Sequence, residues 1–421
     1  MQQPSIPLIT ILSATPFARW QRGLREIMSV APLLITALMA STVQANDAAP
    51  QDAQKPTEIR IGLPDQSAGS KPFIRGPLGL AHIQKQLEKE FEPQGIKIQW
   101  SFFKGAGPAV NEALANKQLD VVYLGDLAAI IGRAGGLPTR VLVGSRGSNS
   151  YLAATPESGI QRIEDLRGKR IAVYKGTADQ LSFERAIKSV GLNERDVRVI
   201  NLDWTAGKAA LAARRVDAVW GGVSLLALRK QGIHIVTTSR ALGWANTTQA
   251  AVLATQDFID HYPGTTQQLV NVLVDNAQWI GEAQHLPDYT ALMAEQSQIP
   301  QAIFQEELKA EDLPFQSSPR LDPFLLSSLQ DSIERAKAAG LIRNTFSASD
   351  WFASQFVDRA LKAKGLESNW AVYDTNGASR EIIMSALTTS AVPERVSATC
   401  PAPVWFRSSA RPAVAVFSSN R

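Results

Sequence analysis

Hydrophobic and polar positions alternate along the chain as strands require, and apolar positions recur in between at helical spacing. Residues 96–101 alternate apolar with polar side chains, as in a half-buried strand, and residues 121–124 form the continuous apolar run of a buried strand. Between these runs, Val110, Ala113 and Leu114 lie on one face of a predicted helix. The order strand, turn, helix, strand predicts an α/β unit.

The turn of this unit contains Gly105, Ala106 and Gly107, and Pro108 follows where the helix should begin. Proline suits the first helical position, because its missing N–H would have no helical partner there. The unpaired N–H groups of a helix start favour an anion. We therefore expect this turn to face a binding crevice.

The same sequence pattern of glycine turn, helix and strand recurs later in the chain. Residues 206–221 repeat the order of glycine, helix and apolar strand that residues 107–125 show. A third glycine turn follows the predicted strand 171–174, where Thr177 is a predicted helix N-cap and Gln180 its capping-box partner. The repeat predicts two similar lobes, each of which offers a glycine turn to a shared cleft.

The other periodic segments complete an α/β chain. Residues after 254 are predicted to be helical up to about residue 365. Further predicted strands cover 58–63, 140–144, 151–155, 197–202, 233–237 and 250–254, and a predicted helix covers 77–91.

The chain divides into lobes and flanking segments. Lobe I is predicted to comprise residues 57–145 and 246–366, and lobe II residues 146–245. Residues 46–56 form a polar linker. Residues 367–421 are rich in Ser, Thr, Ala, Pro and Arg and lose their periodicity, which predicts a poorly ordered extension.

Residues 1–45 have the features of a secretory signal peptide. Three arginines precede the apolar run 28–43, which is shorter than the ~20 residues of a membrane span. Small residues around Ala45 predict cleavage there. The single cysteine, Cys400, lies far from that position, so neither a lipid anchor nor a disulfide is expected. We expect a freely diffusing periplasmic monomer.

Length and charge narrow the class of protein. A chain of 421 residues that is 45% hydrophobic exceeds one ordinary core. The net charge of +4 comes mainly from the two ends, and the body has no run of Lys and Arg. A nucleic-acid partner is therefore not expected.

Catalytic, cofactor and metal motifs are missing from the sequence. The histidines His82, His234, His261 and His285 have no second ligand at metal spacing. The sequence has no Gly-x-Ser-x-Gly elbow and no Walker motif, and Val110 replaces the third glycine of a dinucleotide fingerprint. We expect no catalytic, cofactor-binding or metal-binding residue.

Four tryptophans and one arginine are ambiguous. Trp100, Trp204, Trp220 and Trp244 fall at or near predicted strand ends, where each is either a core residue or a wall of the cleft. Arg146 stands in a polar loop at the predicted crossing between lobes. It is either an anion ligand or a solvated surface residue, expected at the rim of the cleft.

Five stretches between residues 57 and 365 together carry a family resemblance. They read IRIGLPDQSAG, GAGPAVNEALANKQLDVVYLGDLAAI, IEDLRGKRIAVYKGTADQLSFERAI, DWTAGKAALAARRVDAVWGG and VLATQDFIDHYPGTTQQLVNVLVD. In this order they resemble the periplasmic solute-binding proteins of ABC importers for sulfonates, taurine and nitrate, the aliphatic sulfonate-binding type. The resemblance implies a type II periplasmic binding protein fold with two crossing hinge strands and a ligand in the interlobe cleft.

The resemblance also implies a function and a set of binding residues. The protein would not be an enzyme, would need no cofactor, and would deliver a small anion to a permease in the inner membrane. Loop amides and hydroxyls would hold the sulfonate. Carried over position by position, the implied substrate-binding residues are Gln66, Ser67, Gly105, Ala106, Gly107, Gly125, Asp126, Arg146, Ser148, Asn149, Gly176, Thr177, Trp220 and Gly221.

One departure from the family pattern bears on the ligand. Many relatives have Trp-Asp-Pro after the second repeat, whereas Trp220 is followed here by Gly221 and Gly222. The missing acid disfavours taurine, which carries an amine, and favours an amine-free sulfonate or a sulfate ester. The apolar, aromatic strand ends disfavour nitrate.

Two alternatives stay open. The same fold is used by enzymes that resemble the pyrimidine-forming proteins of thiamin synthesis, and these would need a reactive residue such as Lys104 or Lys175 in the cleft. A sensory module without a permease is the other alternative.

Overall fold

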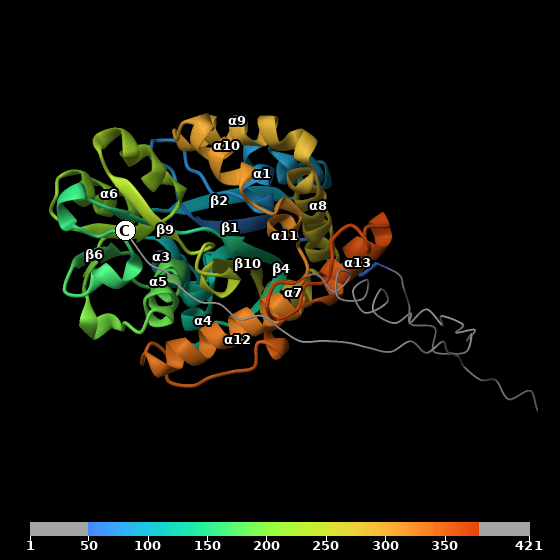
Figure 1. Ribbon diagram of the computed structural model, residues 1–421. Coiled ribbons are helices and arrows are strands. Elements are labelled where there is room, and N and C mark those ends of the chain that lie inside the picture. The colour runs from blue at the N-terminus through green and yellow to red at the C-terminus, as the bar shows by residue number, and fades with distance from the viewer. Residues whose placement is uncertain (1–48, 379–421) are drawn as a thin grey trace, which may run out of the picture. The chain divides into compact units, whose positions relative to one another are not determined.

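Two sheets of five strands organise residues 49–378, the part of the chain that the computed structural model describes (Figure 1). The predicted signal peptide, its cleavage site near Ala45 and residues 379–421 lie outside the described residues. Within residues 49–378, none of the helices is both long enough and apolar enough to cross a membrane.

The first sheet has the strand order β2-β1-β3-β10-β4. Strand β1 runs parallel to β2 and β3, and β10 runs antiparallel to β3 and β4. The strands are β1 (Glu58–Pro64), β2 (Lys97–Phe103), β3 (Val121–Gly125), β4 (Thr139–Ser148) and β10 (Thr248–Thr255).

The second sheet repeats this pattern with the order β7-β6-β8-β5-β9. Strand β6 runs parallel to β7 and β8, and β5 runs antiparallel to β8 and β9. The strands are β5 (Tyr151–Ala154), β6 (Arg170–Val173), β7 (Arg198–Asn201), β8 (Ala218–Gly221) and β9 (His234–Thr238). The predicted α/β class with two lobes is confirmed. Lobe I denotes below the elements around the first sheet, and lobe II those around the second.

Helices connect the strands and cover the sheets. The α-helices are α1 (Pro77–Ile83), α2 (Gln86–Phe91), α3 (Ala106–Ala115), α4 (Asp126–Ala134), α5 (Ala178–Ser189), α6 (Trp204–Ala212), α7 (Gln256–His261), α8 (Pro263–Gly281), α9 (Leu286–Ser297), α10 (Gln301–Lys309), α11 (Leu313–Ser317), α12 (Pro323–Ala338) and α13 (Gln355–Lys364). The 3-10 helices are η1 (Glu92–Gln94), η2 (Pro156–Ser158), η3 (Ile163–Leu166), η4 (Glu194–Asp196), η5 (Val223–Gln231), η6 (Trp244–Asn246), η7 (Ala283–His285) and η8 (Ser349–Trp351).

The predicted helix 77–91 is wrong in one respect, because the segment forms two helices. Lys85 separates α1 from α2 with φ 53, in the left-handed region. A residue in that conformation cannot continue a right-handed helix. The apolar periodicity continues across the break, so the sequence pattern did not reveal it.

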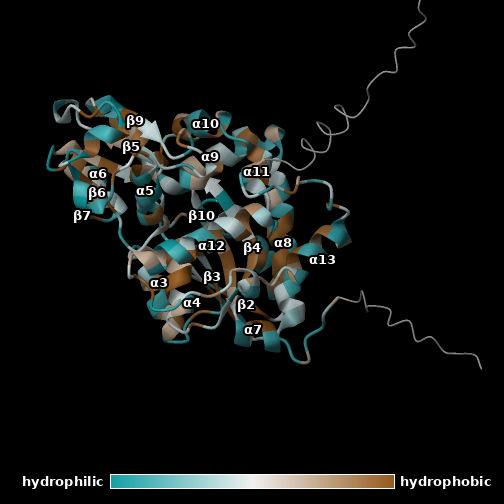
Figure 2. Cartoon of the chain, turned by 60° about the horizontal axis from the view of Figure 1, so that its bottom comes forward, coloured by the Kyte–Doolittle hydropathy of each residue, from teal (hydrophilic) through white to brown (hydrophobic). Residues whose placement is uncertain are grey.

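Apolar periodicity explains how the helices dock on the sheets. Leu269, Val270 and Leu273 of α8 recur at helical spacing and are fully buried. They join one core cluster with Ile59 and Ile61 of β1. Figure 2 shows hydrophobic positions on α8 and on the strands it covers. Each such side chain contributes about 1.5–3 kcal/mol when fully buried.

Two segments cross between the lobes. Strand β4 leads into β5, and β9 leads through η6 into β10. Strand β4 continues to Ser148, so Arg146 belongs to a strand of the first sheet and not to lobe II, where the sequence had assigned it.

Residues next to both described ends pack against the body. The carboxylate of Asp52, in the predicted linker, accepts hydrogen bonds from Thr265 N and Thr265 Oγ1 at the start of α8. Trp370 and Tyr373, in the predicted extension, are buried with exposed fractions of 2% and 6%. Residues 367–378 therefore belong to the packed structure.

Candidate functional site

The glycine turns of the two lobes meet at the strand ends. A Cβ added to Gly125, at the end of β3, would lie 2.9 Å from the Cβ of Ala178 at the start of α5. A Cβ added to Gly176, before α5, would lie 3.0 Å from the Cγ of Pro108 in α3. Two of the predicted binding glycines thus permit close contact between the lobes.

The first residues of α3 also serve packing. A Cβ on Gly107 would lie 2.3 Å from the Cβ of Ala128, so the glycine lets α3 approach α4. Ala106 has φ 51, a left-handed conformation that costs an alanine free energy. Gly105 is the exposed N-cap of α3.

Thr177 lies at the N-cap of α5, as predicted, but the capping box is absent. Its Oγ1 donates a 2.7 Å hydrogen bond to the carbonyl of Tyr174 and does not cap the helix. The Oε1 of Gln180 instead accepts from the N–H of Gly176 at 2.9 Å. This arrangement holds the glycine turn in place.

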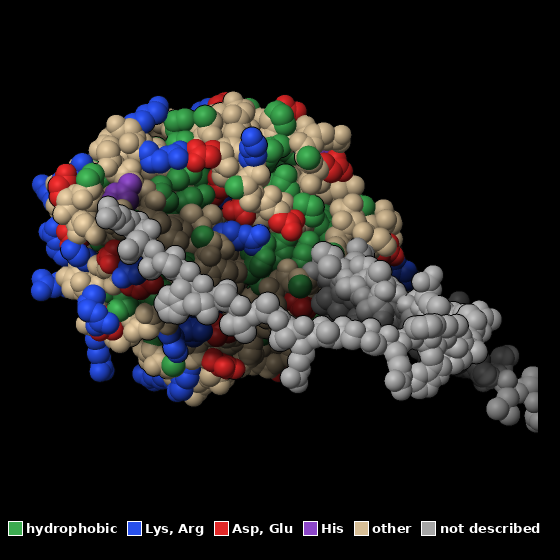
Figure 3. Space-filling view, in the orientation of Figure 1, with side chains coloured by type: hydrophobic (Ala, Val, Ile, Leu, Met, Phe, Trp, Pro, Cys, Tyr) green, Lys and Arg blue, Asp and Glu red, His purple; other side chains and the backbone are tan. Residues whose placement is uncertain are grey.

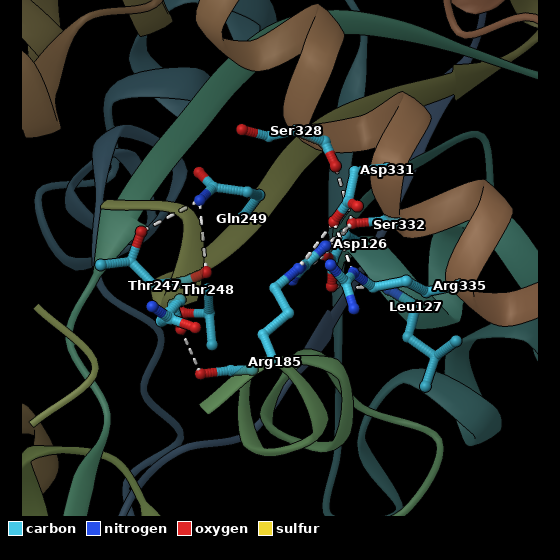
Figure 4. A network of polar contacts seen from close by, with 12 residues as sticks. Asp126, Leu127, Arg185, Thr247, Thr248, Gln249, Ser328, Asp331, Ser332 and Arg335 are labelled. Atoms are coloured by element: carbon cyan, nitrogen blue, oxygen red, sulfur yellow. Dashed lines mark hydrogen bonds and ion pairs between the residues drawn. The ribbon is translucent and has the colours of Figure 1, made fainter. Parts of the chain in front are cut away.

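Asp126 is enclosed between the lobes. Its carboxylate accepts hydrogen bonds from Leu127 N at 2.8 Å and from Ser332 Oγ at 2.7 Å. Arg185 of α5 reaches the same carboxylate at 3.8 Å and also binds Asp331 of α12 (Figure 4). Burial raises the pKa of Asp126 above the usual aspartate value, and the charge of Arg185 opposes that rise. Asp126 thus joins the lobes.

The loop after β1 is tied to the turn before α3. Lys104 donates to Ser67 Oγ at 2.9 Å and forms an ion pair with Asp65, also at 2.9 Å. Gln66 is half-buried, and its N–H donates to the carbonyl of Phe73 at 2.7 Å. The Oγ of Ser67 further donates to the carbonyl of Gly69.

Arg146 does not lie at a solvated rim, which corrects the sequence interpretation. Its side chain is fully buried, and Nη1 forms a 2.6 Å ion pair with Asp322 at the start of α12. A second nitrogen donates to the carbonyl of Arg320. A buried charge requires such partners, and Arg146 finds them within lobe I.

Ser148 and Asn149 hold the crossing strands together. The Oδ1 of Asn149 accepts from Ser239 Oγ and from Arg240 N, each at 3.0 Å. The carbonyl of Ser148 accepts from Thr248 Oγ1 at 3.2 Å. Both residues thus link β4 to the returning segment that ends in β10.

A pocket opens in lobe II at the ends of β6 and β8. Of the sequence-predicted site residues, Trp220 and Gly221 line it. The full lining is Ala172, Tyr174, Leu202, Asp203, Trp204, Gly207, Lys208, Val219, Trp220, Gly221, Gly222, Ser224 and Leu225.

Lys208 in α6 is the residue that sequence reasoning missed. It lines this pocket and a neighbouring groove. Its ammonium has no hydrogen-bond or ion-pair partner among residues 49–378, whereas Lys104 is paired with Asp65. Burial, and then repulsion by Lys104, lower the pKa of Lys208. Its position one helical turn after Trp204 was the available signal.

Aromatic residues form the pocket wall. The indole N–H of Trp220 is buried and has no partner within the described chain. The indole N–H of Trp204 donates instead to Asp179 at 2.8 Å, and the Trp204 ring meets Tyr174 edge-on at 5.2 Å between ring centres. Burial raises the pKa of Asp179. The Trp220 ring itself packs against Phe183 of α5 in the core of lobe II.

Gly222 lines the lobe II pocket and leaves open space beside its backbone. A Cβ there would meet no atom within 4 Å, and its φ of −77 suits any residue. Neither backbone strain nor protein packing thus requires glycine at this position. A side chain would occupy the space open to a ligand.

The described residues form no candidate metal centre. Residues 49–378 contain no group of three or more His, Cys, Asp and Glu side chains that could hold a metal ion. What the pocket offers is the cation of Lys208 and the hydroxyl of Ser224 beside apolar walls.

Several known proteins are similar to this chain in sequence. Residues 91–284 match the family described as NMT1/THI5 like. A relative from Bacillus subtilis (strain 168), whose name describes an aliphatic sulfonates-binding protein, is 27% identical over 61% of this chain and 75% of its own length. The taurine-binding periplasmic protein of Escherichia coli (strain K12) is 28% identical over 48% of this chain and only 62% of its own length.

A solved structure extends the likeness to the fold. The periplasmic sulfonate-binding protein from Methylobacillus flagellatus KT has a TM-score of 0.67 and 26% identity, covering 77% of this chain and 99% of that one. The type II periplasmic binding fold expected from the sequence is confirmed.

Proposed function

We propose that this chain, whose residues 91–284 match the family described as NMT1/THI5 like, is a periplasmic solute-binding protein that captures a small sulfur-containing anion, an aliphatic sulfonate or a sulfate ester. The anion lies between the two lobes and passes to an ABC permease in the inner membrane. The observation that carries the proposal is Lys208, a cation in the cleft with no partner among residues 49–378.

Charge supports an anionic ligand. Burying an unpaired ammonium costs free energy, which an anion at Lys208 would recover. Residues 149–247 carry fifteen Lys and Arg against nine Asp and Glu, whereas residues 248–378 carry eight against seventeen. Figure 3 shows Lys and Arg side chains gathered on the edge that carries β6 and α6. A positive lobe II attracts anions to the cleft.

Hydrogen-bond donors beside Lys208 suit a sulfonate or sulfate group, whose oxygens only accept. The hydroxyl of Ser224 lines the pocket beside Lys208 and can donate to such an oxygen. Hydrogen bonds to charged groups contribute about 1.5–3 kcal/mol each. A few such donors and one cation are enough for micromolar binding.

The pocket favours an anion without an amine. Asp203 is the acid that lines it, and its carboxylate already accepts from Thr205 N and Ala206 N. Gly221 and Gly222 add no carboxylate. Only the Oδ2 of Asp203 is left to pair with an ammonium group such as that of taurine, and nitrate would make no use of the aromatic side chains.

The remaining parts of the proposal concern location and assembly. The N-terminal signal peptide, cleaved near Ala45, would direct the protein to the periplasm, where we expect a monomer. The permease is the expected protein partner.

Titration calorimetry of the purified protein with ethanesulfonate, ethyl sulfate, taurine and nitrate tests the proposal. Lys208→Met should weaken binding of the two amine-free ligands about ten- to a hundredfold, since it deletes the charged donor. Lys188→Met, an exposed lysine of α5, is the matched control. Binding that Lys208→Met leaves unchanged would refute the role of Lys208.

One observation also favours an enzyme as second candidate. A half-buried lysine with a lowered pKa is the type of residue that forms Schiff bases with carbonyl compounds. An absorbing cofactor on Lys208 would colour the purified protein. Mass spectrometry after borohydride treatment should show no added mass if the protein only binds solutes.

A further inference from the structure

The indole ring of Trp244, in η6, packs at the point where the two crossing segments meet lobe I. Its ring centre lies 4.0 Å from that of Phe315 in α11. A Cβ added to Gly147 of β4 would lie 3.0 Å from Trp244 Cζ3 and 2.7 Å from Phe315 Cε1, so the glycine lets both rings rest on the first crossing strand. The Nε2 of Gln316 donates to the carbonyl of Gly147 at 3.0 Å. Trp244, in the second crossing segment, is thus packed against the first.

Residues 371–378, called the strap below, end against the same indole ring. A Cβ added to Gly377 would lie 2.8 Å from Trp244 Cδ1 and 3.1 Å from Trp244 Cγ. A turn holds this end of the strap, because the carbonyl of Asp374 accepts from Gly377 N at 3.0 Å and its carboxylate accepts from Ala378 N at 2.9 Å. Aspartate commonly forms turns by accepting from the backbone that follows it. The turn therefore keeps Gly377 against Trp244.

Asp322, the N-cap of α12, anchors the strap nearer its start. Its Oδ2 forms the 2.6 Å ion pair with Arg146 of β4 and also accepts from Tyr373 N at 3.2 Å. The carbonyl of Tyr373 accepts in turn from Phe324 N at 3.2 Å. One buried carboxylate thus binds both the first crossing strand and the strap.

We propose that the strap restrains the hinge of this protein, because it holds Trp244 and β4 against lobe I and so limits how far the two lobes separate. Hinge motion requires changes of backbone angles at a few residues of the crossing segments. A ring packed against both Phe315 and Gly377 opposes such changes, since its movement would break both contacts. The lobes are in close contact at Gly125 in this structure. The strap therefore favours an arrangement in which the lobes are close.

Hydrogen exchange of the full chain, measured by mass spectrometry without added ligand, tests the inference. Gly377→Ala places a methyl group against Trp244 and strains the backbone, because Gly377 has φ 78. Amides of the crossing segments, residues 144–149 and 243–249, should then exchange about tenfold faster. Gly365→Ala is the matched control, since Gly365 has φ 65 and a Cβ there would meet no atom within 4 Å. It carries the same backbone strain and should leave these amides unchanged.

Asp374→Ala is a second variant, which adds no bulk. It removes the carboxylate that holds the turn, so the crossing segments should again exchange faster. Small-angle scattering should show a larger radius of gyration for Gly377→Ala and Asp374→Ala than for Gly365→Ala. Melting temperatures show that each variant folds.

Two outcomes would overturn the restraint. One is unchanged exchange of the crossing segments in both strap variants. The other is an equal acceleration in β6 of the second sheet, which would show a general loss of stability and no specific effect on the hinge. Neither measurement needs a ligand, so the result is independent of the proposed function.

Discussion

The guanidinium of Arg185 in α5 donates a 2.9 Å hydrogen bond to the carboxylate of Asp331 in α12. A helix of lobe II is thereby fastened to a helix of lobe I. Arg185 also donates to Ser332 and faces Asp126, both of which are buried (Figure 4). The arginine is thus the cation of a polar network enclosed between the lobes.

Arg185→Met should destabilise the protein by about 3–5 kcal/mol, because Asp126 would remain buried without an opposite charge. Arg335→Met, which removes the other arginine bound to Asp331, should cost less than about 1 kcal/mol, since that pair is partly solvated. Urea unfolding measures both values. Similar losses in the two variants would contradict this account of the network.

Close contact between Gly125 and Ala178 predicts how the lobes respond to a larger side chain. Gly125→Ala places a Cβ 2.9 Å from that of Ala178, closer than two such atoms approach. The lobes should then stay further apart. We expect weaker sulfonate binding and less compaction on binding in small-angle scattering, because closure stabilises the liganded state.

A second substitution tests whether that contact is the cause. Ala178→Gly removes the opposing Cβ, so the double variant Gly125→Ala with Ala178→Gly should regain compaction and most of the affinity. Ala178→Gly alone costs at most about 1 kcal/mol at a helix start. If the double variant stayed as weak as Gly125→Ala, steric contact would not be the reason.

Much of the fold followed from the sequence because it depends on local patterns. Apolar spacing predicted β1, β3 and α8, and glycine turns predicted which loops lie at the interlobe edge. The residues of the candidate site followed less well. Lys208 lies in an ordinary helix, and its lack of a partner became visible only when α6 was placed beside Gly222 and Ser224.

Arg146 is a second residue whose surroundings the sequence did not predict. Glycine and polar residues around it predicted a loop, yet β4 runs through them because it pairs with β10. Its charge is neutralised by Asp322, which lies 176 residues away in the sequence. A partner at that separation leaves no local signal, so the sequence could not distinguish a buried ion pair from a ligand site.

The end of the packed structure predicts the effect of two truncations. Trp370 donates from its indole N–H to Ser317 Oγ at 3.1 Å, and the Tyr373 ring meets Phe315 edge-on at 4.7 Å between ring centres. Ending the chain after residue 366 removes both aromatic residues and should cost more than about 3–5 kcal/mol, the usual cost of deleting one buried aromatic side chain. Ending it after residue 378 keeps these contacts.

Urea unfolding of both truncated forms and of the full chain checks this prediction, with Trp370→Ala as a point variant. The form that ends at 378 should match the full chain within about 1 kcal/mol, since no contact named here is lost. Equal stability of the form that ends at 366 would show that Trp370 and Tyr373 contribute little.

The lowered pKa of Lys208 predicts how binding depends on pH. In the free protein, burial and then repulsion by Lys104 hold this pKa below the usual lysine value of 10.5. A bound anion opposes both effects and raises the pKa, so binding takes up a proton once the pH exceeds the pKa of the free protein. Affinity should therefore be constant at low pH and fall as the pH rises through that lowered pKa.

Calorimetric titrations with butanesulfonate from about pH 7 to about pH 10 measure this dependence of the affinity on pH. Lys208→Met should bind more weakly and lose this pH dependence, whereas Lys188→Met should keep it. A pH dependence that persists in Lys208→Met would assign the titration to another group and would refute Lys208 as the cation that binds the anion.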